Sequence, residues 1–409
     1  MSIRWPAAVL AISLLFPRHA SAQSDEPQGW QLMQDAVAYG LFNHQGGQRG
    51  GDEVRLPNWW MGMFTRKVGS SDLTINTMFS LDPLTVGKKG YRELFQVGEA
   101  FEGEPLIDYQ HPHDLFMQLA LVWRMPIGTR TGFTLAGGPA GEPALGPVAF
   151  MHRASAMENP MSPLAHHTLD STHVAFGVVT GAVDHGAWTI EGSIFNGREP
   201  DEDRWDVNFA ALDSFSGRLW FRPRGEWEFQ VSSGRLKAPE ELGHGDVIRT
   251  TASASWLKQN GQDFTAATAA FGVNNGEDAD RAAFLLEATR QAGRYAAYGR
   301  LEFVEVETGV LLANHSLGHA EKDTVTAVTV GALRHLPRWN ALESGIGAAI
   351  TLYGVPDRLR PTHGDRPASF QLFVRIRPAA GAMGRMWNMH MTKPMHPAGA
   401  DPHAGHRMP

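Results

Sequence analysis

The feature that most constrains the fold is an alternation of apolar and polar residues with a period of two, which recurs through most of the chain. In Trp188–Phe195, tryptophan and isoleucine fall on one face, and threonine, glutamate and serine fall on the other. The segment Phe370–Arg377 repeats the pattern with glutamine and arginine between apolar residues, and Phe373 is the exception. Because successive residues of a strand point to opposite sides, each such segment has one apolar and one polar face.

About 15 segments of this kind can be counted, many joined by short polar or glycine turns such as Asn260-Gly261-Gln262, which are typical of hairpins. They extend over residues 59–377. Only Gln31–Tyr39 shows a pattern that resembles a helical period, so residues 23–58 are assigned to a separate N-terminal segment. We therefore expect an all-β fold.

Arginine, glutamate and glutamine occupy the polar face of nearly every predicted strand, which is hard to reconcile with a soluble sandwich of this size. The pattern fits an antiparallel transmembrane β-barrel of about 12–16 strands, apolar outside and wet within. Closure satisfies every backbone group in hydrocarbon and removes both sheet edges. A secreted soluble β-protein remains the alternative, since alternation alone does not distinguish lipid from a protein core.

Residues 1–22 have the features of a secretory signal. Arg4 precedes the apolar run Ala7–Phe16, and Ala20-Ser21-Ala22 is a typical cleavage site. The run is shorter than the roughly 20 residues that a membrane-spanning helix needs, so we expect it to be removed. We accordingly expect export to the cell outer membrane, with outer-membrane lipid and the barrel assembly machinery as partners.

The charge and the absence of cysteine exclude two classes of protein. The full chain has a formal charge of −7, and the loss of Arg4 and Arg18 with the signal brings the mature chain near −9. This balance argues against a nucleic-acid partner, which would favour a basic face. With no cysteine, an exported chain cannot be held together by disulfides.

Taken together, residues 59–377 resemble the outer-membrane β-barrels of Gram-negative bacteria. The resemblance rests on the signal peptide, the hairpin spacing and the alternation. It implies a porin-like scaffold without enzymatic activity. One departure is that residues 378–409 follow the last predicted strand, whereas many such barrels end on an aromatic residue of that strand.

Two short segments gather six histidines. The first, Tyr109–Phe116, contains His111, His113 and Asp114. Pro112 prevents a regular ladder there, so these histidines are expected in a loop or at the barrel rim. The two imidazoles would point the same way, and Asp114 could orient one of them as a metal ligand.

The second segment, residues 151–173, is a long connection that could fold into the barrel and narrow its lumen. Its histidines are His152, His166, His167 and His173. Neutral imidazole suits zinc, copper and nickel, so a metal site is one interpretation. The other is that the histidines form hydrogen bonds that hold a constricting loop to the wall, with Arg153, Glu158, Asn159 and Asp170 as partners.

A third interpretation is catalysis by an outer-membrane lipid hydrolase. It would pair Ser171 with His173 and an orienting Asp170. The sequence lacks the His-x-Ser-Asn-Gly context of outer-membrane phospholipases. We therefore expect no enzyme.

The C-terminal segment, residues 378–409, is rich in methionine and histidine and has no strand pattern, so it is expected to be disordered. Thioethers are soft ligands that select Cu(I), and imidazole accepts both copper states. A copper ion is therefore a possible ligand, although no cofactor is required. A low-complexity extension and a zinc or nickel site are the alternatives. The candidate ligands here are Met389, His390, Met391, Met395, His396, His403 and His406.

The composition of this segment resembles the methionine-rich extensions of copper-resistance outer-membrane proteins. The motifs in residues 109–205 also resemble an uncharacterised family of exported barrels linked to heavy-metal resistance gene clusters. The resemblance implies a pore or scaffold in copper or other heavy-metal handling. A general porin for small solutes, with a loop pinned by histidines, remains the alternative function.

Overall fold

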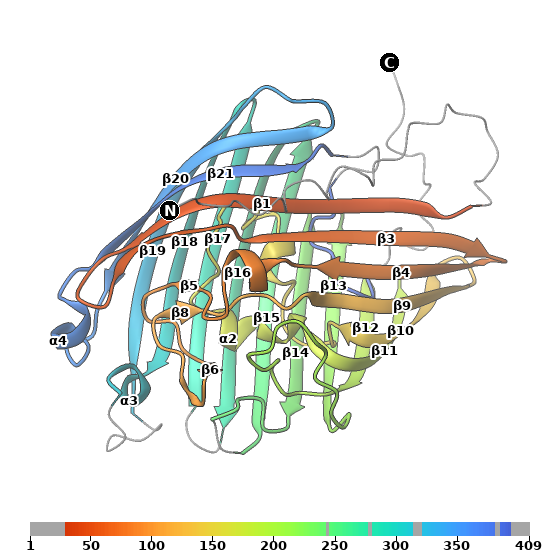
Figure 1. Cartoon of the computed structure of the whole chain (residues 1–409). Coiled ribbons are helices and arrows are strands. Elements are labelled where there is room, and N and C mark those ends of the chain that lie inside the picture. The colour runs from red at the N-terminus through yellow and green to blue at the C-terminus, as the bar shows by residue number, and fades with distance from the viewer. Residues whose placement is uncertain (1–28, 243–244, 277–279, 314–320, 381–384, 394–409) are drawn as a thin grey trace, which may run out of the picture.

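The computed structural model describes residues 29–242, 245–276, 280–313, 321–380 and 385–393, and one antiparallel sheet dominates it (Figure 1). The short strand β2 (Gly51–Arg55) and β3 pair with successive parts of β1, and β1 also pairs with β21, so the sheet closes as a barrel of 16 strands. Its strands are β1 (Gln31–Gln45), β3 (Asn58–Val68), β4 (Ser71–Phe79), β9 (Phe116–Ile127), β10 (Thr131–Gly141), β11 (Ala175–His185), β12 (Trp188–Phe195), β13 (Ser214–Arg224), β14 (Trp227–Leu236), β15 (Val247–Asn260), β16 (Asp263–Gly276), β17 (Asp280–Ala292), β18 (Tyr295–Glu307), β19 (Lys322–His335), β20 (Leu342–Gly354) and β21 (Ala368–Pro378).

The remaining elements are short and lie in the connections between barrel strands. The strands among them are β5 (Tyr91–Arg92), β6 (Ala100–Phe101), β7 (Glu104–Pro105) and β8 (Tyr109–Gln110). The helices are α1 (Asp82–Thr85), α2 (His166–Leu169), α3 (Thr308–Leu311) and α4 (Arg360–His363), with single 3₁₀ turns at Phe150–His152 and Ser171–His173. No helix in the described part of the chain is long and apolar enough to cross a bilayer.

The barrel closes between its first and last strands. Residues Ala38–His44 of β1 pair in antiparallel register with Phe370–Ile376 of β21. With this seam made, every barrel strand has a neighbour on both sides, so no open edge is left to pair with another chain.

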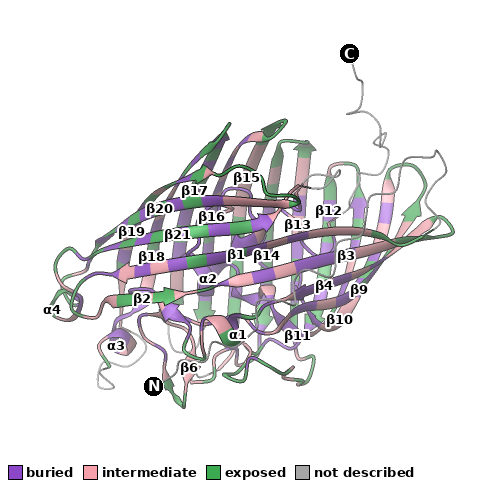
Figure 2. Ribbon diagram, turned by 45° about the horizontal axis from the view of Figure 1, so that its top comes forward, coloured by how far each residue is buried: buried purple, intermediate pink, exposed green. Residues whose placement is uncertain are grey.

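Burial along the strands is inverted relative to a soluble protein (Figure 2). On β12, Ile190 is 64% exposed whereas its neighbour Glu191 is 3% exposed. On β21, Leu372 and Val374 are exposed while Gln371 and Arg375 are buried. Apolar side chains therefore point out of the barrel and polar ones point in, as predicted from the alternation, and the all-β barrel is confirmed.

The barrel begins earlier than the sequence indicated. Residues Gln31–Gln45 form the longest barrel strand rather than a helix, so residues 31–55 belong to the wall and not to a separate N-terminal segment. The strand was missed because its inward face carries Val37, Tyr39 and Leu41, which pack against the interior. Its outward face carries small residues such as Gly40. The strand therefore lacks the usual difference in polarity between an apolar outward face and a polar inward face.

The two ends of the barrel differ. At one end the strands are joined by short turns, such as the two residues 69–70 between β3 and β4. At the other end lie long connections, chiefly residues 80–115 and 142–174. Outer-membrane barrels have short turns on the periplasmic side and long loops on the outer side.

The connection 142–174 fills the lumen. All of its residues are buried except His152, Met157 and His173, and these three are half-buried. Figure 1 shows its helix α2 inside the barrel. We call residues 142–174 the plug.

Charged wall residues hold the plug in place. Arg218, Arg249 and Arg300 project from β13, β15 and β18 and donate to plug carbonyls at 3.1, 2.7 and 2.8 Å. In the reverse direction, the plug residue Arg153 donates to Glu287 of β17 at 2.7 Å. These buried contacts reach the plug from several sides, so arginines rather than histidines pin it to the wall.

Part of the C-terminal segment also lies in the lumen, in contrast to the expectation of disorder. Within Arg385–Lys393, the side chains of Met386, His390 and Met391 are buried. The backbone amide of Asn388 donates to the carbonyl of His152 in the plug at 2.7 Å. Residues 381–384 and 394–409 lie outside the described residues, as do the candidate ligands Met395, His396, His403 and His406 and the predicted signal peptide.

Replacing Val330 tests which face of the wall meets lipid. Val330 lies near the middle of β19 and is 56% exposed. We expect Val330→Arg to lower the free energy of unfolding by about 2–4 kcal/mol, the cost of a cation near the bilayer midplane. The measurement is urea unfolding in lipid vesicles followed by tryptophan fluorescence. Val330→Ala removes the same side chain without adding charge, and an equal loss in both variants would contradict a lipid-facing wall.

Candidate metal site

The histidines that the sequence singled out converge inside the barrel. The ring centroids of His111 and His167 lie 5.6 Å apart, and those of His166 and His167 lie 5.3 Å apart. The ring of His166 is also 5.3 Å from that of His173, which is 6.1 Å from His113. Five imidazoles thus form one continuous cluster, which we call the imidazole chain.

One end of the imidazole chain has the geometry of a metal site. Ligand atoms of Glu99, His111 and His167 all lie within 4.8 Å of one another. Two imidazoles with one carboxylate are a common protein ligand set for zinc, which leaves a fourth position open. We call these three residues the Glu99 triad.

Two buried ring nitrogens of the Glu99 triad, Nε2 of His111 and Nδ1 of His167, each face a carboxylate. Nδ1 of His167 lies 3.5 Å from Oε1 of Glu199. Nε2 of His111 faces Oε1 of Glu99 at 3.0 Å, while its Nδ1 is 3.1 Å from the carbonyl of Pro112. If Nδ1 carries the proton and donates to that carbonyl, two acceptors face each other, and a cation between them would satisfy both.

The other rings of the chain are oriented by acceptors. Nδ1 of His113 lies 2.8 Å from Asp82 of α1, and Nδ1 of His166 lies 2.6 Å from Asp170. Nδ1 of His173 lies 2.9 Å from the backbone carbonyl of Asp170. Acceptors placed in this way fix the tautomer and leave Nε2 as the free lone pair, as they do around metal-binding histidines.

Burial keeps most of these rings neutral. It lowers the pKa of His166 to about 4 against the opposing effect of Asp170, and it also lowers the pKa of His111 although Glu99 acts in the opposite direction. At His167, burial is outweighed by Glu199 and Glu99, so its pKa is raised. The carboxylates around His167 therefore favour a positive charge at this end of the chain.

A glycine makes room for His167. A Cβ added at Gly98 would lie 2.7 Å from Cγ of the His167 ring, and Gly98 has a φ of +130°, which side chains rarely adopt. The close approach of residues 98 and 99 to the ring depends on this glycine.

Several predicted site residues have other partners. Asp114 contacts Arg204 at 3.3 Å and does not orient a histidine, because Asp82 occupies that position beside His113. Burial raises the pKa of Asp114 to about 7, although Arg204 opposes the shift. The ring of His111 lies beside His167, and the ring of His113 lies beside His173. The two side chains therefore diverge, whereas the extended backbone around Pro112 predicted that they point the same way.

The remaining predicted histidines in the described residues lie outside the imidazole chain. His152 packs edge-on against Trp59 with ring centroids 5.5 Å apart and lines the same cavity as His173, so the two ends of segment 151–173 do approach each other. His390 stacks on Trp220 at 4.7 Å, and its Nε2 accepts from Arg222 at 2.9 Å. A nitrogen that accepts from a guanidinium is not free to bind a metal.

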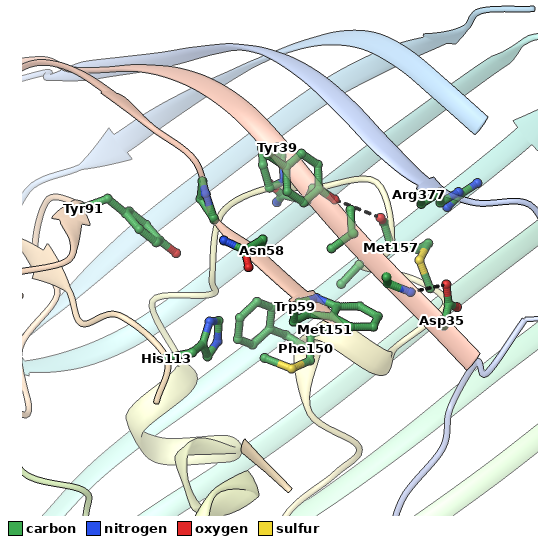
Figure 3. Close-up of a pocket in the computed structure, with 16 residues that line it drawn as sticks. Asp35, Tyr39, Asn58, Trp59, Tyr91, His113, Phe150, Met151, Met157 and Arg377 are labelled. Atoms are coloured by element: carbon green, nitrogen blue, oxygen red, sulfur yellow. Dashed lines mark hydrogen bonds between the residues drawn. The ribbon is translucent and has the colours of Figure 1, made fainter. Parts of the chain in front are cut away.

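Between the plug and the β1–β3 wall lies a small cavity of about 50 Å³ (Figure 3). Tyr39 and Trp59 line it from the wall, and Phe150 lines it from the plug. The hydroxyl of Tyr39 is 3.5 Å from the carbonyl of Met157. The plug therefore fits the wall closely on this side.

The hydrolase interpretation finds no support in this geometry. Oγ of Ser171 accepts a hydrogen bond from Arg249 at 3.0 Å, and His173 contacts the carbonyl of Asp170. No hydrogen bond among the described residues joins Ser171 to a histidine. A nucleophile without its base is not activated.

Sequence reasoning missed the carboxylates of the site. Glu99 and Asp82 lie in the long connection 80–115, and Glu199 lies after β12. None has a spacing to histidine that marks it as a partner. The only signal was the density of acidic residues in Phe195–Trp205, which includes Glu199.

No protein-family model matches the sequence, and no curated protein sequence matches it significantly. Solved structures with a similar fold include OprB of Pseudomonas putida, with a TM-score of 0.54 and 9% identity over 86% of this chain and 94% of that one. An anion-selective porin from Comamonas acidovorans has a TM-score of 0.52 and 10% identity over 85% and 99%. OmpF of Salmonella typhi, in complex with daunomycin, has a TM-score of 0.50 and 9% identity over 86% and 99%. At such identities the likeness shows the fold alone, a porin-like barrel.

Replacing His111 tests the Glu99 triad. We expect the full-length protein in detergent to bind Zn²⁺, and His111→Asn to weaken binding by at least about tenfold, or about 1.4 kcal/mol. Isothermal titration calorimetry measures the affinity. His185→Asn is the matched control, because His185 is an exposed residue at the end of β11. Equal affinity in the two variants would place the metal elsewhere.

Proposed function

We propose that the protein is an outer-membrane barrel that binds metal cations in a plugged lumen and passes them along its imidazole chain. The observation that carries this proposal is the continuous row of rings in the imidazole chain. Its rings follow one another at centroid distances of 5.3–5.6 Å from the Glu99 triad through His166 to His173. A path of imidazoles, most of them neutral, offers successive binding positions to a cation that would not cross a plug made of apolar and paired groups.

The entrance to this path is acidic. A cleft of about 220 Å³ lies against the Glu99 triad, and its lining includes four carboxylates, Glu99, Glu199, Asp201 and Glu241, and one cation, Arg198. An excess of one sign of charge in a cleft raises the local concentration of counter-ions. The cleft is formed by the long connections, which lie on the outer side of the membrane in barrels of this class. Cations would therefore be collected from the outer side.

The membrane location is supported by the inverted burial pattern. Leu121, Ile190, Val330 and Leu372 are among the many large apolar side chains exposed on the outside of the barrel. Such a surface requires lipid around it, since soluble proteins rarely expose apolar patches larger than a few hundred Å². Lipid and the barrel assembly machinery are then the expected partners.

A general porin for small solutes is the second candidate, and the likeness to porin folds favours it. A general porin needs an open, water-filled lumen. Here the wall charges that would set its selectivity are engaged with the plug. Arg300 donates to plug carbonyls, Glu302 accepts from the amide of Ala165 at 3.1 Å, and Arg375 contacts Glu158.

Proteoliposomes distinguish the two functions. We expect the wild-type protein to admit Zn²⁺, detected by a trapped fluorescent indicator, but not arabinose, detected by liposome swelling. His166→Asn interrupts the imidazole chain without removing a member of the Glu99 triad, so the flux of Zn²⁺ should fall severalfold while His185→Asn retains it. Entry of arabinose together with Zn²⁺ entry unaffected by His166→Asn would favour the porin.

A further inference from the structure

Three adjacent wall strands carry methionine on their inward faces, where a wet barrel lumen is normally polar. Met61 of β3 and Met78 of β4 are paired directly across the two strands, and Met117 projects from the neighbouring β9. All three are buried, with exposures of 5%, 3% and 1%. Directly paired residues of antiparallel strands have Cβ atoms about 4.5–5.5 Å apart on the same face, so the thioethers of Met61 and Met78 are neighbours.

The C-terminal segment brings two more thioethers to the same place. Met389 and Met391 line one cavity together with Met61, Met78 and Met117. The segment is anchored on both sides of this position. The amide of Asn388 donates to the His152 carbonyl at 2.7 Å, and Nζ of Lys393 is 2.5 Å from Glu228 of β14.

A glycine accommodates the sulfur of Met391. A Cβ added at Gly141, the last residue of β10, would lie 3.2 Å from Sδ of Met391 and 2.7 Å from a methyl group of Val178. The wall therefore has a recess where the C-terminal segment approaches it.

The cavity has the size of a single ion. Its volume is about 20 Å³, and about 10–15 Å³ is enough to admit one water molecule. The plug closes the remaining side with His152 and His173. We call this space the thioether cavity.

His173 presents a free nitrogen in this part of the lumen. Its Nδ1 lies 2.9 Å from the carbonyl of Asp170, which can only accept, so the proton of the neutral ring is on Nδ1. Its Nε2 is buried and has no hydrogen-bond partner. A buried unpaired acceptor is costly unless something binds to it.

The charged groups nearest the cavity are already paired. Arg218 contacts Glu142 at 2.9 Å and Glu191 at 2.6 Å, and Arg222 donates to His390. The lining groups that remain available to a ligand are therefore the thioethers, the imidazoles of His152 and His173, and the side-chain amide of Gln118.

We propose that the thioether cavity binds one soft monovalent cation, Cu(I) or Ag(I), with its ligands drawn from the thioethers of Met61, Met78, Met117, Met389 and Met391 and Nε2 of His173. Thioether and imidazole ligands together select Cu(I) over harder cations, and Ag(I) is its redox-inert analogue. The inference rests on the proposed function and gives it a substrate class. His173 belongs to the imidazole chain and also lines the cavity, so the imidazole chain connects the acidic cleft to this site.

The competing explanation is that the methionines only fill space, as methionine does in many cores. Space-filling alone does not account for the position of an unpaired imidazole nitrogen, Nε2 of His173, beside this cavity. Methionine also recurs here on four separate segments of chain, namely β3, β4, β9 and residues 385–393.

The test is a titration of the full-length protein in detergent with Ag⁺. We expect one ion to bind, and the double variant Met61→Leu, Met78→Leu to weaken binding by more than about tenfold, since even the outer partners of metal ligands cost about 10–100-fold. Leucine conserves the volume of methionine, so the fold should persist. The matched control is Met125→Leu, because Met125 lies at the short-turn end of β9 and outside the cavity.

X-ray absorption of the Cu(I)-loaded protein provides an independent readout. We expect sulfur scattering mixed with a nitrogen contribution that is lost in His173→Asn. Affinity for Ag⁺ that is unchanged in the double variant, or a copper spectrum without sulfur, would overturn the proposal. Zn²⁺ binding and flux that persist while Ag⁺ fails to bind would also overturn it, but would leave the proposed function standing.

Discussion

The structure depends on the pairing of β1 with β21. Because Ala38–His44 meets Phe370–Ile376, the sheet has no edge and the molecule has an inside and an outside. The backbone ladder satisfies its own donors and acceptors, so the outer surface can be apolar without penalty in lipid. The same closure creates a lumen that must be filled by water or by part of the polypeptide, and in this protein the plug fills it.

The plug determines which polar groups in the lumen are paired and which remain available to a ligand. Placing residues 142–174 inside a barrel buries many polar groups, and each requires a partner. Wall arginines meet plug carbonyls, and carboxylates such as Asp82 and Asp170 meet histidines. Nε2 of His111 and Nδ1 of His167 face the carboxylates of Glu99 and Glu199, and Nε2 of His173 has no hydrogen-bond partner. These are the positions at which we propose that cations bind.

The sequence predicts the barrel well because the alternation directly reports two faces in different solvents. It singles out the histidines as candidate ligands, and the fold brings His111, His166, His167 and His173 close together. It does not predict which carboxylates join them, since Glu99 comes from a connection with no regular pattern. The strand β1 was missed because it packs apolar residues inward against the plug. Met61 and Met78 were missed for a related reason, since a methionine in a strand is normally interpreted as a residue of a packed hydrophobic core.

The position of residues 385–393 has a consequence for the order of assembly. These residues follow β21, whose pairing with β1 seals the wall, and they enter the lumen from the end where the strands are joined by short turns. They can occupy the interior only once an interior exists. A partly assembled barrel would therefore lack two of the thioethers that line the thioether cavity, and the site proposed for a soft ion would be completed last.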